Sequence, residues 1–289
     1  MEKITKAIVP VAGLGTRFLP VTKALPKEML PIVDKPVVQY VVEELVRGGI
    51  TDIIFVTGQG KRAIEDHFDF NPILETWLEK SGKTRELEEI RKIASLANFV
   101  YIRQKGPYGN GTPVLNARHL IGKDEPFVLA WGDEFFQNPE NSPIGQILDV
   151  YEKYQNPVLC VHDTDDEGTK RFGIVEGEEV ETSIFKISKF VEKPGPSATK
   201  SRLAHLWSYV LTPDIFTELE RTPIRNNELW LADAVANLGK KRQLYAKKVD
   251  GKYFDVGTKS SWLKTNLAFG LANDIMREDI EKFLKNMKA

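Results

Sequence analysis

The sequence predicts an α/β fold with a mixed, mostly parallel sheet flanked by helices. Strand-like and helix-like segments alternate along the chain, a pattern typical of such sheets. The first apolar run, residues 7–11, leads directly into Gly13-Leu14-Gly15. Open α/β sheets bind ligands at the carboxyl ends of their strands, so this glycine loop also predicts a Rossmann-like arrangement with a ligand site beside the first strand.

In the first half of the chain, strands and helices are expected in turn. Short apolar runs bounded by turn residues predict buried strands, and longer periodic segments bounded by proline or glycine predict helices. The expected strands are residues 7–11, 52–57, 99–103 and 126–131, and the expected helices are residues 37–48, 60–68 and about 143–154.

Residues 71–97 have a different pattern. They are highly charged, with leucines such as Leu78 and Leu87 at helical spacing, and Gly82 interrupts the run. This predicts a helical hairpin inserted into the α/β domain. A solvated hairpin without catalytic groups is the simplest interpretation.

The second half is expected to hold more strands, separated by short turns and two helices. Residues 260–288 are expected to form a helical extension with a break near Asn273-Asp274. The chain has no internal repeat, low-complexity tract or long linker, so we expect one continuous domain over residues 1–289. The strands expected in this half are residues 157–162, 172–175, 184–191, 204–211 and 242–249.

Composition excludes several classes of protein. The 40 basic and 41 acidic side chains nearly cancel, which argues against a nucleic-acid partner bound through backbone charge. No apolar stretch approaches the roughly 18 residues of a membrane span. The single cysteine, Cys160, excludes an intramolecular disulfide and suits a reducing compartment. With no signal-like N-terminal segment, we expect a cytoplasmic protein.

The glycine loop predicts binding of a triphosphate. Bare N–H groups in the loop can form an anion nest, and Arg17 and Lys27 add positive charge. An ordinary turn is the alternative. A dinucleotide fingerprint is disfavoured because Phe18 stands where a third glycine is needed, and no Gly-Lys-Ser/Thr follows as in a P-loop.

Two aspartates are candidate metal ligands. Asp133 follows Gly132 at the tip of a buried strand, where a carboxylate suits Mg²⁺. Asp255 is expected in a turn just before a helix that begins near Thr258. The alternatives are an exposed turn aspartate at 133 and a helix N-cap at 255.

The segment from Gly13 to Pro31 resembles the signature of the sugar-1-phosphate nucleotidyltransferases. The resemblance runs from Lys3 to about Phe269, with the motifs in the family order. It implies the nucleotidyltransferase fold and a divalent metal, Mg²⁺. In detail the chain looks most similar to the uridylyltransferase branch, which also carries a hairpin like that of residues 71–97. This implies that UTP and glucose 1-phosphate are converted to UDP-glucose and pyrophosphate by a homodimer or homotetramer.

The resemblance also implies site residues, transferred position by position. Val191-Glu192-Lys193-Pro194 and Phe172-Gly173 match family motifs of the sugar site, although a Glu-Lys pair beside proline is also typical of a surface turn. Arg171 is either a phosphate contact or a solvated arginine. The implied catalytic residues are Arg17, Lys27 and Lys193. The implied nucleotide-binding residues are Ala12, Gly13, Gly15, Thr16, Glu28, Gln104 and Gly109. The implied sugar-binding residues are Gly173, Glu192 and Lys193, and the implied metal ligands are Asp133 and Asp255.

The base specificity rests on Gln104, whose amide offers the donor and acceptor that suit a uracil edge. Relatives usually continue with Gly-Leu-Gly-His-Ala, whereas this chain has Gly-Asn-Gly-Thr-Pro, with Thr112 and Pro113 at the last two positions. The alternatives are therefore a related transferase using dTTP or CTP, or a non-catalytic regulator that binds a nucleotide sugar.

Overall fold

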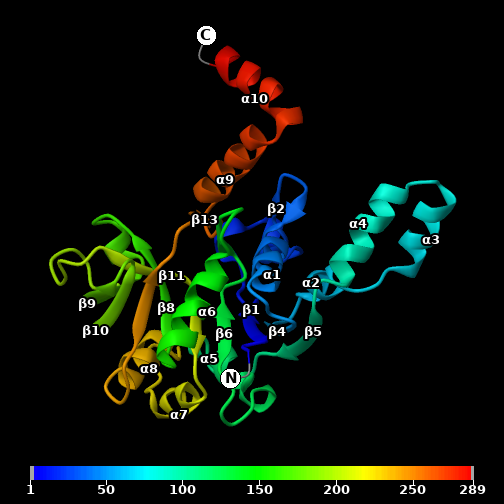
Figure 1. Ribbon diagram of the computed structural model, residues 1–289. Helices are drawn as coiled ribbons and strands as arrows, with labels where there is room; N and C mark the ends of the chain where they lie inside the picture. Colours follow the sequence, from blue (N-terminus) through cyan, green and yellow to red (C-terminus); the bar gives the residue numbers. More distant parts are fainter. Residues whose placement is uncertain (1–2, 288–289) are drawn as a thin grey trace.

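The computed structural model describes residues 3–287, and its centre is a nine-stranded sheet (Figure 1). The strands are β1 (Lys6–Pro10), β4 (Asp52–Thr57), β5 (Asn98–Arg103), β6 (Phe127–Ala130), β8 (Val158–Asp163), β9 (Gly173–Glu181), β10 (Ile184–Glu192), β11 (Leu203–Leu211) and β12 (Tyr245–Lys248). Their order is β5-β4-β1-β6-β11-β8-β12-β10-β9. Each strand expected from the sequence is present, with ends shifted by a few residues.

The sheet has a parallel half and a largely antiparallel half. Strands β5, β4, β1 and β6 pair in parallel. From β11 onward the pairings are antiparallel, apart from the parallel pair of β8 and β12. The mixed sheet is confirmed, but "mostly parallel" describes only the first half. Short turns in the second half allow neighbouring strands to pair antiparallel, which a parallel crossover does not.

Helices cover both faces of the sheet. Alternate residues of β1 show the two layers, because Ala7 and Val9 pack with α1 and α6 while Ile8 packs with α5, α7 and α8. The covering helices are α1 (Val37–Arg47), α5 (Gly111–Asn116), α6 (Pro143–Tyr154), α7 (Asp214–Arg221) and α8 (Leu231–Leu238). The short 3₁₀ helices are η1 (Thr16–Phe18), η2 (Val21–Lys23), η3 (Lys27–Met29), η4 (Arg118–Leu120) and η5 (Gly168–Lys170).

Two small sheets were not expected from the sequence. Strand β7 (Glu134–Gln137) pairs antiparallel with β13 (Lys252–Asp255), and β2 (Pro31–Ile32) pairs with β3 (Lys35–Pro36). Asp255, expected in a turn, is therefore the last residue of a strand. Strands β7 and β13 pair across a long stretch of the sequence, and β2 and β3 have only two residues each, so neither pair carries a clear strand pattern of its own.

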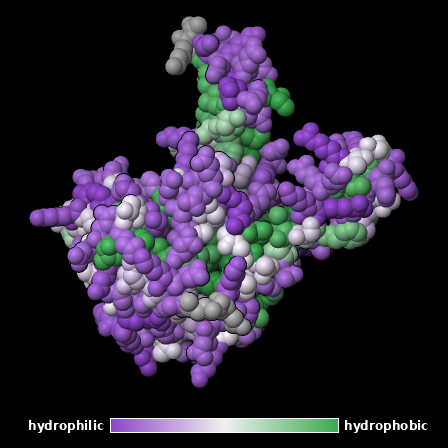
Figure 2. Space-filling model, in the orientation of Figure 1, coloured by the Kyte–Doolittle hydropathy of each residue, from purple (hydrophilic) through white to green (hydrophobic). Residues whose placement is uncertain are grey.

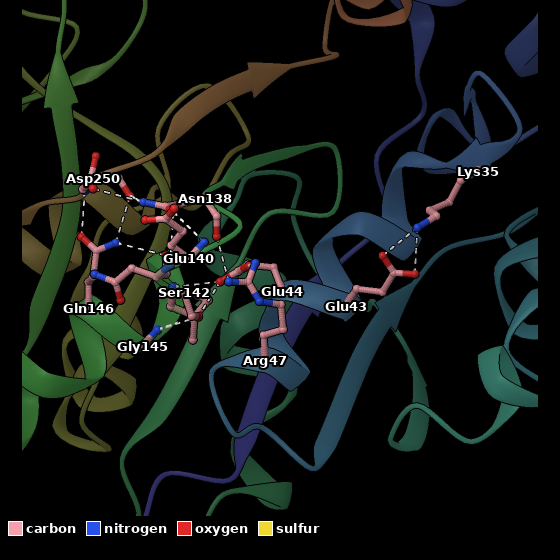
Figure 3. A network of polar contacts seen from close by, with 12 residues as sticks. Lys35, Glu43, Glu44, Arg47, Asn138, Glu140, Ser142, Gly145, Gln146 and Asp250 are labelled. Carbon is pink, nitrogen blue, oxygen red and sulfur yellow. Dashed lines mark hydrogen bonds and ion pairs between the residues drawn. The ribbon is translucent and has the colours of Figure 1, made fainter. Parts of the chain in front are cut away.

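A buried polar network ties α1 to the segments around β7 and β13 (Figure 3). The carboxylate of Glu44 accepts hydrogen bonds from the Ser142 hydroxyl at 2.6 Å and from the Ile144 N–H at 3.3 Å. Gln146 exchanges hydrogen bonds of 2.9 and 2.7 Å with the backbone of Asp250. The network fixes the start of α6 against α1 and anchors the chain two residues before β13.

Two helical arms project from the body (Figure 1). After α2 (Arg62–His67), the helices α3 (Pro72–Lys80) and α4 (Thr84–Ala94) form the predicted hairpin. At the C-terminal end, α9 (Lys259–Ala272) and α10 (Asp274–Asn286) meet at Asn273, whose side chain caps α10. The break is where the sequence predicted it. Residues 1, 2, 288 and 289 of the predicted domain lie outside the described residues.

No helix within residues 3–287 is both long enough and apolar enough to cross a membrane.

Candidate active site

The glycine loop after β1 packs closely on Lys27. Gly15 has a φ of 67°, a left-handed conformation that other residues rarely adopt. A Cβ atom at Gly13 would lie 3.2 Å from Cε of Lys27, and one at Gly15 would lie 3.2 Å from its Cβ. Both glycines therefore allow the loop to lie against the lysine side chain, beside Arg17 of η1.

The pairing of β7 with β13 brings Asp133 and Asp255 together. Asp255 stands opposite Glu134, and the N–H of Val256 donates to the carbonyl of Asp133 over 3.3 Å. A Cβ atom at Gly257 would lie 3.0 Å from Oδ1 of Asp255 and 3.8 Å from Oδ2 of Asp133. The two carboxylates thus converge above Gly257, although they come from distant parts of the chain.

Each of these carboxylates is paired with a cation. Nζ of Lys27 lies 2.5 Å from Oδ2 of Asp133, and Nη2 of Arg171 lies 2.9 Å from Oδ2 of Asp255. Burial alone would lower the pKa of Lys27, but the charges of Asp133 and Glu28 outweigh it and raise the pKa. Lys27 is therefore held in its charged form.

Glu134 lies beneath the two aspartates and accepts a hydrogen bond from the Tyr253 hydroxyl. Burial, together with the charges of Asp133 and Asp255, raises the pKa of Glu134 to about 8, against the opposing effect of the Tyr253 hydrogen bond. The Tyr253–Glu134 hydrogen bond links β7 to β13 directly under the place where the two aspartate carboxylates converge.

The predicted sugar residues gather at the ends of β9 and β10. Gly173 stands opposite Glu192, and a Cβ atom at Gly173 would lie 2.6 Å from the Phe190 ring and 3.1 Å from Oε2 of Glu192. Lys193 has a φ of 47°, its Nζ lies 3.2 Å from Oε1 of Glu192, and it lies 5.3 Å from the centre of the Trp230 ring. The backbone therefore turns sharply at Lys193, and the Lys193 side chain lies beside Gly173.

Several of these groups line one cavity of about 390 Å³. Its wall carries Arg17 from beside the glycine loop, the aspartate pair, and Lys193 from the predicted sugar site. Four cationic and three acidic side chains lie on its wall, a suitable environment for a phosphorylated ligand and a cation. The lining residues are Arg17, Asp133, Glu134, Lys170, Arg171, Phe172, Lys193, Tyr253, Asp255 and Gly257.

Glu28, predicted to bind the nucleotide, has its side chain buried beneath the glycine loop. Glu28 is 1% exposed, and its Oε2 lies 2.7 Å from Nζ of Lys61, which is also buried. From η3, Lys27 reaches Asp133 on the cavity wall, whereas Glu28 faces the interior. Glu28 thus supports the loop from beneath through its pair with Lys61, and its contact with the nucleotide stays a prediction.

The base-recognition residues lie outside the cavity lining. The N–H of Gln104 donates to the carbonyl of Thr57 over 2.8 Å, which places Gln104 at the end of β5. Gly109 has a φ of 108°, and a Cβ there would lie 2.3 Å from the carbonyl oxygen of Leu229. A glycine is thus required at 109 because the backbone packs closely on Leu229. This reason is independent of the expected contact with the base. Thr112 is buried within α5.

The remaining nucleotide-binding candidates belong to the glycine loop. Ala12 is half-buried beside Gly58, and Thr16 is exposed at the start of η1. With Gly13 and Gly15 they lie in the same loop as Arg17, next to the cavity wall rather than on it.

Sequence reasoning missed several cavity residues. Lys170 and Tyr253 were not singled out, and Glu134 was considered as an additional group at the metal but not chosen. Arg171 was left open between a phosphate contact and a solvated residue. Lys170 and Arg171 come immediately before the Phe172-Gly173 motif in the sequence, and this position could have indicated that both line the site.

The donor set fits a hard divalent cation. Asp133 and Asp255 offer carboxylate oxygens at a cavity that also holds Arg17 and Lys193, and Mg²⁺ is usually held by one or two carboxylates together with substrate phosphates. Within residues 3–287 no group of three or more His, Cys, Asp or Glu is arranged to hold a metal by itself. The two aspartates thus fit an ion whose remaining ligands come from the substrate and water.

Comparison with known proteins identifies relatives over nearly the whole chain. The family model described as Nucleotidyl transferase matches residues 6–270. A UTP–glucose-1-phosphate uridylyltransferase of Bacillus subtilis is 46% identical over 288 residues, which cover 99% of this chain and 98% of the relative.

Solved structures give the same picture. A UDP-glucose pyrophosphorylase complexed with UDP-glucose superposes with a TM-score of 0.85 at 36% identity, covering 93% of this chain and 100% of that one. A UTP-bound enzyme of the same kind from Acinetobacter baumannii gives a TM-score of 0.89 at 34% identity, covering 97% and 98%. The mixed α/β fold predicted from the sequence is confirmed.

Proposed function

This chain belongs to the nucleotidyl transferase family, and on that premise we propose that it converts UTP and glucose 1-phosphate into UDP-glucose and pyrophosphate. The observation that carries the proposal is the cavity at which Arg17, Lys193 and the two aspartates converge. The full-length similarity to a uridylyltransferase of Bacillus subtilis supports the choice of substrates.

The reaction needs no covalent enzyme intermediate. A phosphate oxygen of glucose 1-phosphate attacks the α-phosphorus of UTP, the bond to the bridging oxygen of the β-phosphate breaks, and pyrophosphate leaves with that electron pair. The protein then contributes mainly by positioning the reactants and neutralising charge. A wall with four cationic side chains suits this task.

The glycine loop is the proposed triphosphate cradle. Its backbone N–H groups from Gly13 to Arg17 would bind phosphate oxygens, and Arg17 and Lys27 would balance their charge. Lys27 is available in the charged form because neighbouring carboxylates raise its pKa.

We assign Mg²⁺ to Asp133 and Asp255. A divalent cation is typical of this family. When bound, it neutralises phosphate charge and polarises the reacting phosphoryl group. The residues would hold it with their carboxylate oxygens, while Glu134 and Tyr253 keep β7 and β13 paired beneath them.

Lys193 and Glu192 would divide recognition of the sugar phosphate. Lys193, a compact charge, would bind the phosphate, and Glu192 would accept hydrogen bonds from sugar hydroxyls. Gly173 leaves room beside Glu192 because its missing Cβ would stand 3.1 Å from that carboxylate.

The test is a pyrophosphate-release assay with four nucleoside triphosphates and several sugar 1-phosphates. We expect UTP with glucose 1-phosphate to be used best. Thymine differs from uracil by one methyl group, worth about 1–3 kcal/mol in a pocket, so preference over dTTP should be roughly ten- to two-hundredfold. A mixture of UTP and dTTP that yields mainly the thymidine product would refute the base assignment, and nucleotide-sugar binding without pyrophosphate release would favour a regulator.

We also propose that the protein is a homodimer or homotetramer in the cytoplasm. Both arms carry exposed apolar side chains, including Ile73 at 86% and Ile275 at 89% exposed (Figure 2), and such patches on projecting elements favour association. The single cysteine is buried and free, as suits a reducing compartment. Light scattering after size exclusion would measure the assembly.

A further inference from the structure

Arg171 lies against one of the two proposed metal ligands, a place that the proposed reaction does not explain. Its Nη2 is 2.9 Å from Oδ2 of Asp255. The other oxygen of Asp255, Oδ1, accepts the N–H of Gly257 over 2.7 Å. Both oxygens of this carboxylate are therefore engaged by the protein itself.

Asp133 is engaged through its Oδ2, which lies 2.5 Å from Nζ of Lys27. A divalent cation needs carboxylate oxygens as ligands, so it competes with these contacts for the two aspartates. Lys27 and Arg171 thus place positive charge directly against the two carboxylates.

The two pairs differ in how easily they open. The side chain of Arg171 is 55% exposed, and besides Asp255 its guanidinium contacts the Phe172 ring, with 5.0 Å to the ring centre. The Asp255 side chain is 21% exposed, and a pair with one well-solvated partner is worth about 1 kcal/mol or less, so Arg171 can leave Asp255 at small cost. Lys27 is enclosed by the glycine loop and is part of the proposed triphosphate cradle.

We propose that Arg171 is an internal counter-ion that competes with the divalent cation for Asp255, so that the free protein binds the cation more weakly than its two carboxylates would allow. This inference rests on the assignment of the metal to Asp133 and Asp255 in the proposed function. It gives Arg171 a positioning role, since it acts through Asp255.

The chain provides a matched control in the neighbouring residue. Lys170 carries the same charge, lines the same cavity and is 54% exposed, but its Nζ pairs with Glu167 at 2.6 Å. Removing Lys170 changes the local field without freeing Asp255. The Arg171 and Lys170 variants each lose one positive charge at the cavity, but only the Arg171 variant loses a direct contact with Asp255.

The experiment measures Mn²⁺ binding to the complete, nucleotide-free protein by electron paramagnetic resonance. Arg171→Gln should bind Mn²⁺ about fivefold more tightly than the parent protein, which corresponds to about 1 kcal/mol. Lys170→Gln should change the affinity less than about twofold, on the scale of an exposed charge. Arg171→Lys keeps a competing cation and should stay close to the parent protein.

Unchanged or weaker Mn²⁺ binding by Arg171→Gln would overturn the proposal, and so would an equal gain in Lys170→Gln, which would indicate a general field effect. Asp255→Asn identifies the site measured: if it leaves Mn²⁺ binding unchanged, the ion binds elsewhere and both the counter-ion and the metal assignment fail. Formation of UDP-glucose by the parent protein is assayed separately, so that failure of the proposed reaction is distinguishable.

Discussion

Lys27 and Glu28 are neighbours in the chain, yet their ion pairs lie in two different regions. Lys27 pairs with Asp133 at the cavity, where the two side chains are 25% and 23% exposed. Glu28 pairs with Lys61 beneath the glycine loop, where they are 1% and 6% exposed. The cavity pair can exchange partners when a ligand arrives. The buried pair cannot, because opening it would leave an unsolvated charge. Burial therefore separates the supporting pair from the pair available for chemistry.

The largest expected effect comes from breaking the buried pair. Lys61→Ala leaves the Glu28 carboxylate unpaired in the interior and should lower the free energy of unfolding by about 3–5 kcal/mol, measured by urea denaturation. Lys27→Ala should lower it by only about 1 kcal/mol or less, because water reaches Asp133.

A double variant sharpens this result. Lys61→Met with Glu28→Gln removes both buried charges and should recover much of the lost stability. If Lys27→Ala proves as destabilising as Lys61→Ala, the distinction between the two regions is wrong.

At the cavity pair, the expected loss is in turnover rather than stability. Asp133→Asn removes a proposed metal carboxylate and should lower kcat on the order of a hundredfold, equivalent to about 2.7 kcal/mol. The melting temperature should shift by only about 2–4 °C or less, measured by calorimetry. Near-normal Mg²⁺-dependent turnover would remove Asp133 from the mechanism.

Another buried group extends the comparison to pH. Burial lowers the pKa of His205 to about 3, although its Nδ1 contacts the Cys160 carbonyl at 3.0 Å. Between pH 3 and the unfolded value near 6.5, only the unfolded chain takes up this proton. Neutral His205 therefore makes its full contribution to stability above about pH 6.5. Below that pH, the free energy of unfolding falls by roughly 1.4 kcal/mol per pH unit.

The measurement is urea denaturation of the parent protein and His205→Gln between pH 4 and pH 7. The variant lacks this proton uptake, so its stability should depend less steeply on pH in that window. Identical slopes for the two proteins would contradict the assignment to His205.

The smallest expected effect concerns the sugar side of the cavity. Lys193→Ala should lower kcat/KM for glucose 1-phosphate about tenfold, or about 1.4 kcal/mol, and leave UTP binding nearly unchanged. Glu192→Gln should relax the choice among sugar 1-phosphates, because it alters the hydroxyl contacts only. Initial rates with several sugars test this, and equal weakening of UTP binding in both variants would contradict the division of roles.

The sequence was informative where the signal is local. The strand at Asp52–Thr57 and the helix at Pro143–Tyr154 were predicted within a few residues, because their residues alone carry the apolar pattern and the capping signals. The break at Asn273 was also predicted. The resemblance to the family likewise depends on contiguous motifs, so it identified Asp133 and Lys193 as candidates.

Contacts between distant segments were decided by the tertiary structure. Glu28 was predicted at the ligand and is buried on Lys61, Gly109 packs on Leu229, and Asp255 ends a strand that exists only by pairing with β7. The sequence by itself determined the α/β class, the order of elements and the residue types available for phosphate chemistry. Only the tertiary structure decided which charges are buried and which partners they meet, because solvent exposure and ion pairing depend on how remote segments pack together.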